Sequence, residues 1–255
     1  MGNIYFASDA HLGSLLIGDN SEREKKLVCW IKSIKKDAGA LYLLGDMFDF
    51  WFEYKHCIPK GNIRFLSALC ELTDNGIPVH YHTGNHDIWA FDYLRKECGV
   101  EIHRGDEIAE IYGKRFYLGH GDGLDPNDKG YLFLKKVFHN RFLQKCFRLI
   151  HPDIGIRFAH RWSGHSRVKP TGSIEAPPVT EEEKEAIAAF CKGKLEHEDI
   201  DYFIFGHRHQ PIDMAISDKC RYINTGDWIT HYSYAVFDGH KLNLKFYPQT
   251  SLDIS

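Results

Sequence analysis

Apolar and polar positions follow two patterns along the first hundred residues of the chain. Short apolar runs with the length and composition of buried strands occupy residues 3–7, 41–44 and 78–82. Amphipathic stretches, with apolar side chains at helical spacing on one face, occupy residues 21–36 and 63–73. This order of strand, helix, strand, helix and strand predicts parallel strands joined by right-handed crossovers.

The pattern changes after residue 107. Two apolar segments, 108–112 and 115–118, flank Gly113-Lys114, which predicts a hairpin with a tight turn. Residues 124–170 contain no strand pattern and are expected to be helical, with a single helix over 131–150. This segment is therefore expected to interrupt an otherwise mixed α/β chain.

The last third of the chain returns to strands after one more helix. Residues 180–198 form a charged amphipathic stretch that opens with Thr180-Glu181-Glu182-Glu183, a capping-box sequence. Apolar runs at 202–205, 222–226 and 233–237 predict short strands. We find no internal repeat and no low-complexity tract.

Length and composition favour one globular α/β unit. The 255 residues are 43% hydrophobic, which is enough for a sizeable core, and the formal net charge is −3. The seven cysteines are scattered without a Cys-x-x-Cys pair, which argues against a disulfide framework or a zinc knuckle and favours a reducing cytosol. No apolar run approaches 18 residues, and the first residues lack signal-peptide features, so we expect neither a membrane span nor a leader.

Five of the apolar runs end in residues that are common in catalytic and metal sites. Each is followed by a glycine, carboxylate, amide or imidazole residue. These strand-end residues are Asp9, His11, Asp46, Asn85, His86, His120, His207 and His209. Mixed carboxylate, amide and imidazole donors suit manganese, iron or zinc. If Asp9-x-His11 and His207-x-His209 stay extended, both side chains of each pair point to one side. Asp46, with both carboxylate oxygens free, would bridge two metal ions that clamp a phosphoryl group.

Taken together, the five segments resemble the signature blocks of the calcineurin-like metallophosphoesterases. One such segment alone is a common turn, but five in this order are not explained by turns. The blocks are Asp9-x-His11, Gly45-Asp46-x-x-Asp49, Gly84-Asn85-His86-Asp87, Gly119-His120 and Gly206-His207-x-His209.

The resemblance implies a fold, a ligand set and a catalytic residue. The fold would be α/β, a four-layer αββα sandwich of two mixed sheets, with residues 1–255 as one domain and 124–170 as a helical lid inserted in it. One metal would be held by Asp9, His11, Asp46 and His209, and the other by Asp46, Asn85, His120 and His207. Manganese is the expected metal, with iron or zinc as alternatives. His86 would assist the leaving oxygen, and Asp87 would orient that histidine.

A narrower resemblance points to the UDP-2,3-diacylglucosamine diphosphatases of lipid A synthesis, which also carry a helical insertion after the His-Gly-Asp block. In that comparison, the residues near the substrate would be Asn85, His86, Asp128, Tyr131, Arg161, Ser163, Ser166 and Arg167. One position departs from the branch, because its best-known members have arginine where this chain has His86. The substrate therefore stays open between the lipid A intermediate and a different phosphoester.

The charge of the insertion favours a lipid substrate. Residues 124–170 contain ten Lys or Arg and three Asp, a net charge of +7, which leaves −10 for the rest of the chain. The same segment is rich in Leu and Phe. A cationic and apolar lid suits an anionic lipid and an anionic membrane surface, although these side chains could also only seal the lid onto the sandwich.

The leading hypothesis is a dimetal hydrolase that cleaves UDP-2,3-diacylglucosamine to UMP and the acylated sugar 1-phosphate. We expect it in the cytoplasm, peripherally bound to the inner membrane, with a nucleotide-lipid as substrate and no nucleic acid as partner. The alternatives are a phosphodiesterase or phosphatase of a soluble nucleotide, and a non-catalytic scaffold, which the complete ligand set disfavours.

Overall fold

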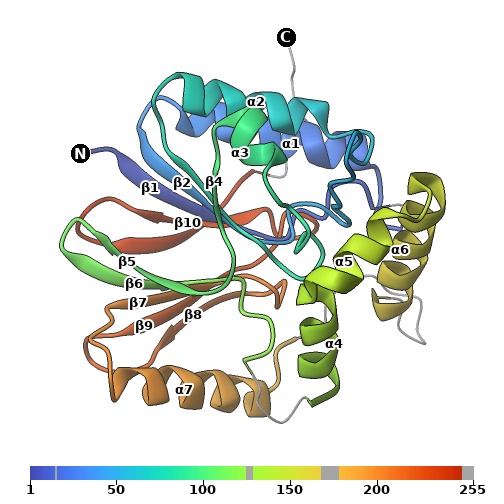
Figure 1. The fold of residues 1–255 in the computed structure, drawn as a ribbon. Coiled ribbons are helices and arrows are strands. Elements are labelled where there is room, and N and C mark those ends of the chain that lie inside the picture. Colours follow the sequence, from blue (N-terminus) through green and yellow to red (C-terminus); the bar gives the residue numbers. More distant parts are fainter. Residues whose placement is uncertain (15, 125–128, 168–177, 249–255) are drawn as a thin grey trace.

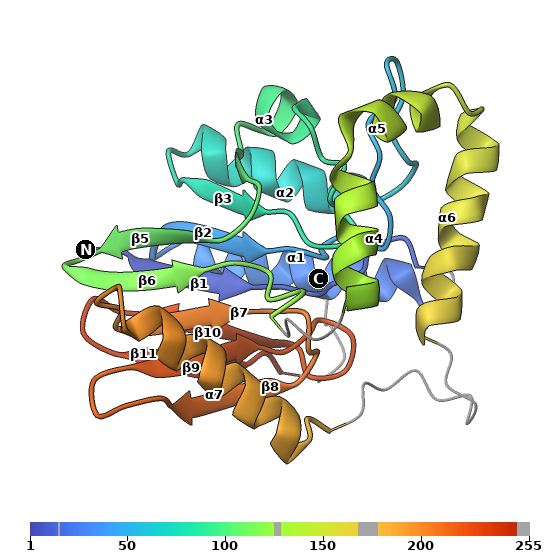
Figure 2. The same ribbon diagram turned by 60° about the horizontal axis from the view of Figure 1, so that its bottom comes forward.

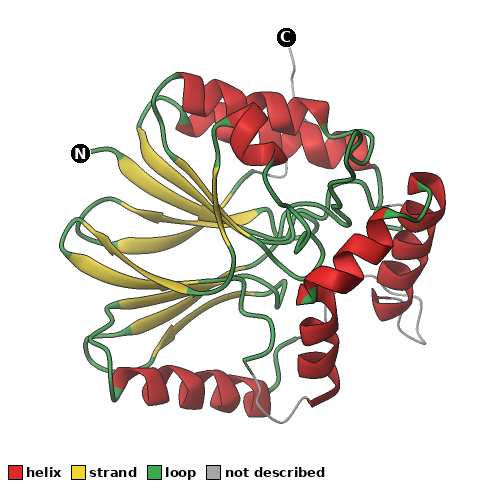
Figure 3. Cartoon of the chain, viewed as in Figure 1, coloured by secondary structure: helices red, strands yellow, loops and turns green. Residues whose placement is uncertain are grey.

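The computed structural model describes residues 1–14, 16–124, 129–167 and 178–248, and within residues 152–167 it leaves out the side chains of His160 and residues 162–167. Two β-sheets face each other between layers of helices (Figures 1 and 3). The predicted α/β sandwich with two mixed sheets is confirmed.

The first sheet has six strands in the order β11-β10-β1-β2-β3-β4. Strands β1 to β4 run parallel to one another. Strand β10 pairs antiparallel with β1, and β11 pairs antiparallel with β10. The strands are β1 (Asn3–Ala7), β2 (Ala38–Leu44), β3 (Val79–His82), β4 (Glu101–His103), β10 (Ser233–Phe237) and β11 (Leu242–Phe246).

The second sheet has five strands in the order β5-β6-β7-β9-β8. The hairpin of β5 and β6 leads into parallel pairs β6–β7 and β7–β9, and β8 closes the edge antiparallel to β9. The strands are β5 (Glu107–Ile111), β6 (Lys114–Leu118), β7 (Tyr202–Phe205), β8 (Pro211–Ala215) and β9 (Arg221–Thr225).

Helices cover the outer face of each sheet. The first sheet is covered by α1 (Asn20–Ile34), α2 (Ile63–Asp74) and α3 (Tyr93–Cys98), and the second by α7 (Glu181–Leu195) (Figure 1). Three apolar layers therefore hold four layers of structure together. Representative buried residues are Trp30 and Leu43 beneath the first helices, Phe6 and Phe116 between the sheets, and Ile187 and Phe203 beneath α7.

Local capping explains where the covering helices begin. The side chain of Asp19 accepts hydrogen bonds from the first turn of α1, which satisfies backbone donors that have no partner within the helix. At the start of α7, Thr180 and Glu183 form both bonds of a capping box. The capping box predicted from the sequence is confirmed.

The segment after β6 forms three helices, α4 (Lys129–His139), α5 (Arg141–Arg148) and α6 (Pro152–Arg167). They stand together at one end of the two sheets (Figure 2). The single helix expected over 131–150 is wrong, because Asn140 leaves the helical conformation and caps α5 by accepting from the backbone N–H groups of Phe142 and Leu143. This break lets α5 turn away from the axis of α4.

One face of the three helices packs on the sandwich and another face stays exposed. Phe147 of α5 packs against the aromatic rings of Phe52 and Trp89. On the exposed face, Phe142 and Leu149 remain 70% and 88% exposed. Some apolar side chains of the insertion therefore seal it onto the sandwich, and others remain exposed to solvent.

Within the described residues, no helix combines the length and apolar character that a membrane crossing requires. Four short elements were not individually predicted: α3, β4, β8 and β11. They have three to six residues, too few for a periodic pattern to distinguish them from loops.

Candidate metal centre

All eight strand-end residues lie at the carboxyl ends of parallel strands, where the two sheets meet. In α/β sheets this edge is the usual place for ligands, since the loops that leave the strands converge there. Asp9 and His11 follow β1, Asp46 follows β2, Asn85 and His86 follow β3, His120 follows β6, and His207 and His209 follow β7.

The first ligand group joins Asp9, His11 and His209. Oδ1 of Asp9 lies 3.4 Å from Nε2 of His209 and 3.7 Å from Nε2 of His11. The two imidazole nitrogens are 3.2 Å apart. This Asp9 oxygen is buried and accepts no hydrogen bond from the described residues, so a cation fits the site.

The second ligand group joins Asp46, His120 and His207. Nε2 of His120 lies 3.2 Å from Oδ2 of Asp46 and 3.2 Å from Oδ1 of Asn85. Burial lowers the pKa of His207 to about 3, so its imidazole is neutral and keeps a lone pair for a metal.

Asp46, a member of the second group, also lies next to His11 of the first. Its Oδ2 also lies 3.7 Å from Nε2 of His11, and the residue is only 1% exposed. Burial alone would raise the pKa of Asp46, but the facing rings of His120, His86 and His11 hold the pKa well below its ordinary value. The expectation that both oxygens are free is wrong, because Oδ1 accepts the backbone N–H of His86 at 2.8 Å. A single oxygen thus faces both groups.

The backbone at these residues is left-handed. Asp9, His11, Asp46, His207 and His209 have φ angles between 43° and 69°. The expectation that Asp9-x-His11 and His207-x-His209 stay extended is therefore wrong. The left-handed turns bring Asp9 and His11 into one ligand group and direct His207 and His209 to different groups. Such strain is typical of functional sites.

Two glycines allow the strand ends to touch. A Cβ atom on Gly84 would meet the Asp46 carboxylate and would lie 2.6 Å from the Asp46 backbone nitrogen. A Cβ atom on Gly45, whose φ is +88°, would lie 2.7 Å from Nδ1 of His120. Only glycine lets the backbones after β2 and β3 come this close.

Two of the ligand histidines are oriented by contacts to the ring nitrogen that faces away from the metal site. Nδ1 of His120 lies 2.8 Å from the backbone oxygen of Leu44, and Nδ1 of His209 lies 3.6 Å from Oδ2 of Asp227. Such contacts fix the ring so that the other nitrogen can bind a metal. The sequence analysis missed Asp227, although Thr225-Gly226-Asp227 after β9 repeats the pattern of strand, glycine and carboxylate.

The partner expected for His86 is also corrected. Asp87 does not take that role, because its oxygens accept from the backbone of Met47 and Gly84 and from the hydroxyl of Tyr81. Nδ1 of His86 lies instead 2.9 Å from the backbone oxygen of Asp49, an acceptor, so Nδ1 carries the proton. Nε2 of the same ring faces Asp46 Oδ2 at 4.0 Å.

The residues expected near the substrate are only partly described. The Tyr131 hydroxyl donates to Asp122 at 2.6 Å, and its ring lies 6.3 Å from the ring of His207, so α4 reaches the second ligand group. Arg161 is exposed on α6. Asp128, and the side chains of Ser163, Ser166 and Arg167, lie outside the described residues.

Comparisons with known proteins agree with this geometry. Residues 2–211 match the model of the calcineurin-like phosphoesterase family. A protein of Porphyromonas gingivalis named UDP-2,3-diacylglucosamine hydrolase is 40% identical over 95% of this chain and 96% of its own length. A protein of the same name from Vibrio atlanticus is 28% identical over 94% of this chain and 96% of its own length.

Among solved structures, one described as a novel archaeal phosphodiesterase aligns with 96% of this chain and 99% of its own, with a TM-score of 0.49 and 12% identity. The family match and the two ligand groups that meet at Asp46 identify the site as a dimetal centre.

We predict that Gly84→Ala disrupts this centre. The new methyl group must displace Asp46, so we expect the purified protein to lose most of its bound metal while the sandwich still folds. Elemental analysis and circular dichroism measure the two effects. Gly193→Ala is the control, since a Cβ atom there meets nothing within 4 Å. Full metal content in Gly84→Ala protein would contradict the prediction.

Proposed function

Because the chain belongs to the calcineurin-like phosphoesterase family, we propose that it hydrolyses the diphosphate of UDP-2,3-diacylglucosamine to UMP and 2,3-diacylglucosamine 1-phosphate. The family match and the hydrolase-named relatives make it a metal-dependent phosphoester hydrolase. The substrate is carried to this chain from the name of the 40% identical relative. One structural observation supports it above others, an apolar cavity that opens beside His86.

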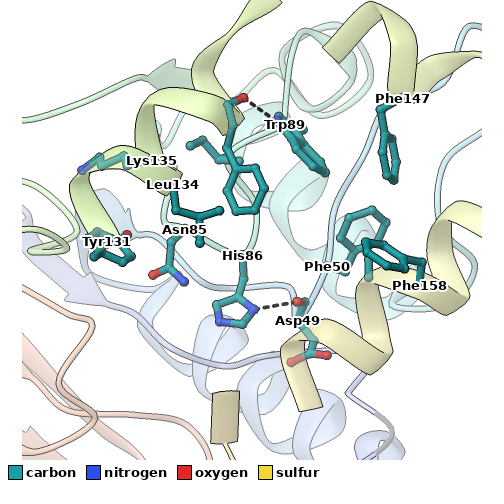
Figure 4. Close-up of a pocket in the computed structure, with 13 residues that line it drawn as sticks. Asp49, Phe50, Asn85, His86, Trp89, Tyr131, Leu134, Lys135, Phe147 and Phe158 are labelled. Atoms are coloured by element: carbon teal, nitrogen blue, oxygen red, sulfur yellow. Dashed lines mark hydrogen bonds between the residues drawn. The ribbon is translucent and has the colours of Figure 1, made fainter. Parts of the chain in front are cut away.

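This cavity has a volume of about 260 Å³ and lies between the metal centre and the helical insertion. Its polar lining comes from Asp49, Asn85, His86, Tyr131 and Lys135, and most of its remaining wall is apolar (Figure 4). The apolar lining comes from Phe50, Ile88, Trp89, Leu134, Phe138, Phe147, Phe158 and Ala159. An acyl chain next to the diphosphate would bury its apolar surface against such a wall.

The size of the cavity also suits a lipid that is only partly enclosed. Pockets that bury a whole drug-sized ligand measure roughly 300–1,000 Å³, so two acyl chains do not fit inside. Their ends would extend past α5 and α6, where exposed apolar side chains continue the surface. We therefore propose that residues 124–170 act as a lid that holds the chains near the sugar.

The residues of the chain have separable roles in this reaction. Two divalent ions, of which we propose manganese, would neutralise phosphate charge and activate a water molecule at Asp9, His11, Asp46, Asn85, His120, His207 and His209. The His86 ring is held by donation from Nδ1 to the Asp49 backbone oxygen, and in its imidazolium form it would give the proton on Nε2 to the leaving oxygen. Lys135 lines the cavity and pairs with Asp122 at 2.6 Å, so its cation would lie near the proposed position of the diphosphate.

The position of His86 also bears on the rival substrate class. A histidine is the general residue at this position of the family, so a soluble nucleotide diester is the second candidate function. A comparison of substrates separates the two candidates, and a substitution that narrows the apolar cavity shows whether the cavity binds the acyl chains.

We predict that Asp46→Ala and His86→Ala have different consequences. Asp46 Oδ2 faces both ligand groups, so Asp46→Ala should remove activity and lower the bound metal. His86→Ala should keep both metals and lose about 10²–10⁴-fold in kcat, the usual contribution of a proton-transfer residue. Rate assays and elemental analysis of the same samples measure both. Wild-type activity in Asp46→Ala would show that the centre is wrongly assigned.

We predict a strong preference for acylated substrate. With manganese present, hydrolysis in ¹⁸O-labelled water should be much faster for UDP-2,3-diacylglucosamine than for UDP-N-acetylglucosamine or a simple diester. Ala159→Phe narrows the cavity and should reduce this preference by about tenfold or more, since a single buried ring displaces several methylene groups. Ala215→Phe, on the exposed side of β8, is the control. Equal wild-type rates on all three substrates would favour the soluble-nucleotide candidate.

We also propose that the exposed face of the insertion binds the anionic surface of the cytoplasmic side of the inner membrane. Phe133, Phe142, Leu149 and Ile154 are each at least 64% exposed there. Beside them lies a second cavity of about 530 Å³ with a basic lining from Arg104, Arg141, Lys145 and Arg148. Apolar and basic side chains together are the features that bind a membrane interface.

We predict that Phe142→Gln/Leu149→Gln protein binds vesicles of phosphatidylglycerol and phosphatidylcholine at least about tenfold more weakly than wild type. The reason is the loss of two apolar side chains that would be buried in the membrane on binding. Sedimentation with vesicles measures the change. Ile63→Gln/Phe246→Gln removes two side chains of similar exposure (72% and 59%) outside the insertion and should leave binding intact. Equal losses in both variants would contradict the proposal.

A further inference from the structure

A second cluster of histidines and carboxylates lies apart from the dimetal centre, where the edge of the first sheet faces β5. We call it the β3–β4 cluster, and it consists of His80 and His82 on β3, Glu101 and His103 on β4, and Glu107 on β5. Strands β3 and β4 pair in parallel, with His80 opposite Glu101 and His82 opposite His103. Alternate residues of a strand share a face, so these four side chains project together.

Three of these residues hold their ligand atoms at the spacing of a metal site. Nδ1 of His80 lies 3.1 Å from Nε2 of His103 and 3.3 Å from Oε2 of Glu101. All three atoms lie within 4.8 Å of one another. In a tetrahedral zinc site with bonds of about 2.0–2.1 Å, neighbouring ligand atoms are roughly 3.3 Å apart.

Glu107 supports this arrangement from behind. Its Oε2 lies 2.8 Å from Nδ1 of His103, so this nitrogen carries the proton and the lone pair of Nε2 faces His80. Its Oε1 lies 3.3 Å from Nε2 of His82, a buried atom without a hydrogen-bond partner among the described residues. A carboxylate behind a ligand histidine is the common second layer of a zinc site.

The charge of the cluster also calls for a cation. Burial lowers the pKa of His80, which favours its neutral, metal-binding form. Among the described residues, the ion-pair partners of Glu101 and Glu107 are histidines, and no lysine or arginine pairs with them. With neutral imidazoles the cluster carries two negative charges, which a divalent ion would balance.

We infer that the β3–β4 cluster is a third metal site, in which His80, His103 and Glu101 bind zinc and Glu107 orients His103. Imidazole with carboxylate is a donor set that zinc prefers. The site stands at the three-residue strand β4, the edge of its sheet. Zinc there would fasten this short strand to β3 and, through Glu107, to the second sheet. The role is structural and independent of the substrate.

Metal content tests the inference directly. Wild-type protein saturated with zinc and then dialysed should retain three zinc ions per chain, and His80→Ala/Glu101→Gln protein should retain two. His197→Ala/Glu196→Gln is the matched control, since both side chains are exposed and lie outside the cluster, and it should retain three. Two zinc ions in the wild type, or three in the cluster variant, would overturn the inference.

Thermal unfolding gives a second readout that does not depend on the dimetal centre. In an Asp9→Asn/Asp46→Asn background, which removes a carboxylate from each ligand group of the dimetal centre, zinc at about 100 times its Kd should raise the Tm by roughly 5–10 °C. Adding His80→Ala/Glu101→Gln should abolish the rise, whereas His197→Ala/Glu196→Gln should not. An unchanged rise in the cluster variant would overturn the proposed site, even if the variant were less stable without metal.

Discussion

The structure depends on one buried carboxylate oxygen, Oδ2 of Asp46, that faces both ligand groups. The oxygen lies between His11, from the loop after β1, and His120, from the loop after β6 of the other sheet. Two sheets can meet at one atom only if their loops approach closely, and this requirement explains glycine at Gly45 and Gly84. The sandwich and the centre therefore depend on each other. Packing of the layers brings the strand ends together, and the contacts of Asp46 Oδ2 with His11 and His120 fix the distance between the two sheets at this point.

Most of the centre could be predicted because its residues follow apolar strands at short fixed spacing. A strand end is visible in a sequence, and its position in a parallel sheet follows from the order of elements. The contacts behind the centre were not predictable in the same way. Asp227 reaches His209 from a strand added late in the chain, and the backbone oxygen of Asp49 holds His86, which no side-chain pattern reveals. The left-handed backbone at Asp9 likewise depends on tertiary contacts.

In the function we propose, the helical insertion separates recognition of the substrate from the reaction itself. The strand ends supply the phosphoester chemistry of the family, and the cavity beside His86 is closed on its other side by side chains of the insertion such as Leu134 and Phe158. Its helical character and charge followed from the sequence. The break at Asn140 did not, because apolar spacing continues across it while the capping geometry changes the direction of the chain. That change of direction lets one apolar face pack inward and another remain exposed.

The left-handed residues of the centre have a consequence for the life of the protein in a cell. Each such residue costs about 1–3 kcal/mol, and five of them lie where carboxylates and imidazoles are also crowded. In a newly made chain, this cost is not offset by the binding of metal ions. The metal-free protein therefore unfolds more often than the metal-bound form and is cleaved sooner by proteases. A shortage of the metal would thus shorten the half-life of the protein as well as remove its activity. The supply of the ion would then determine how much of the protein the cell contains.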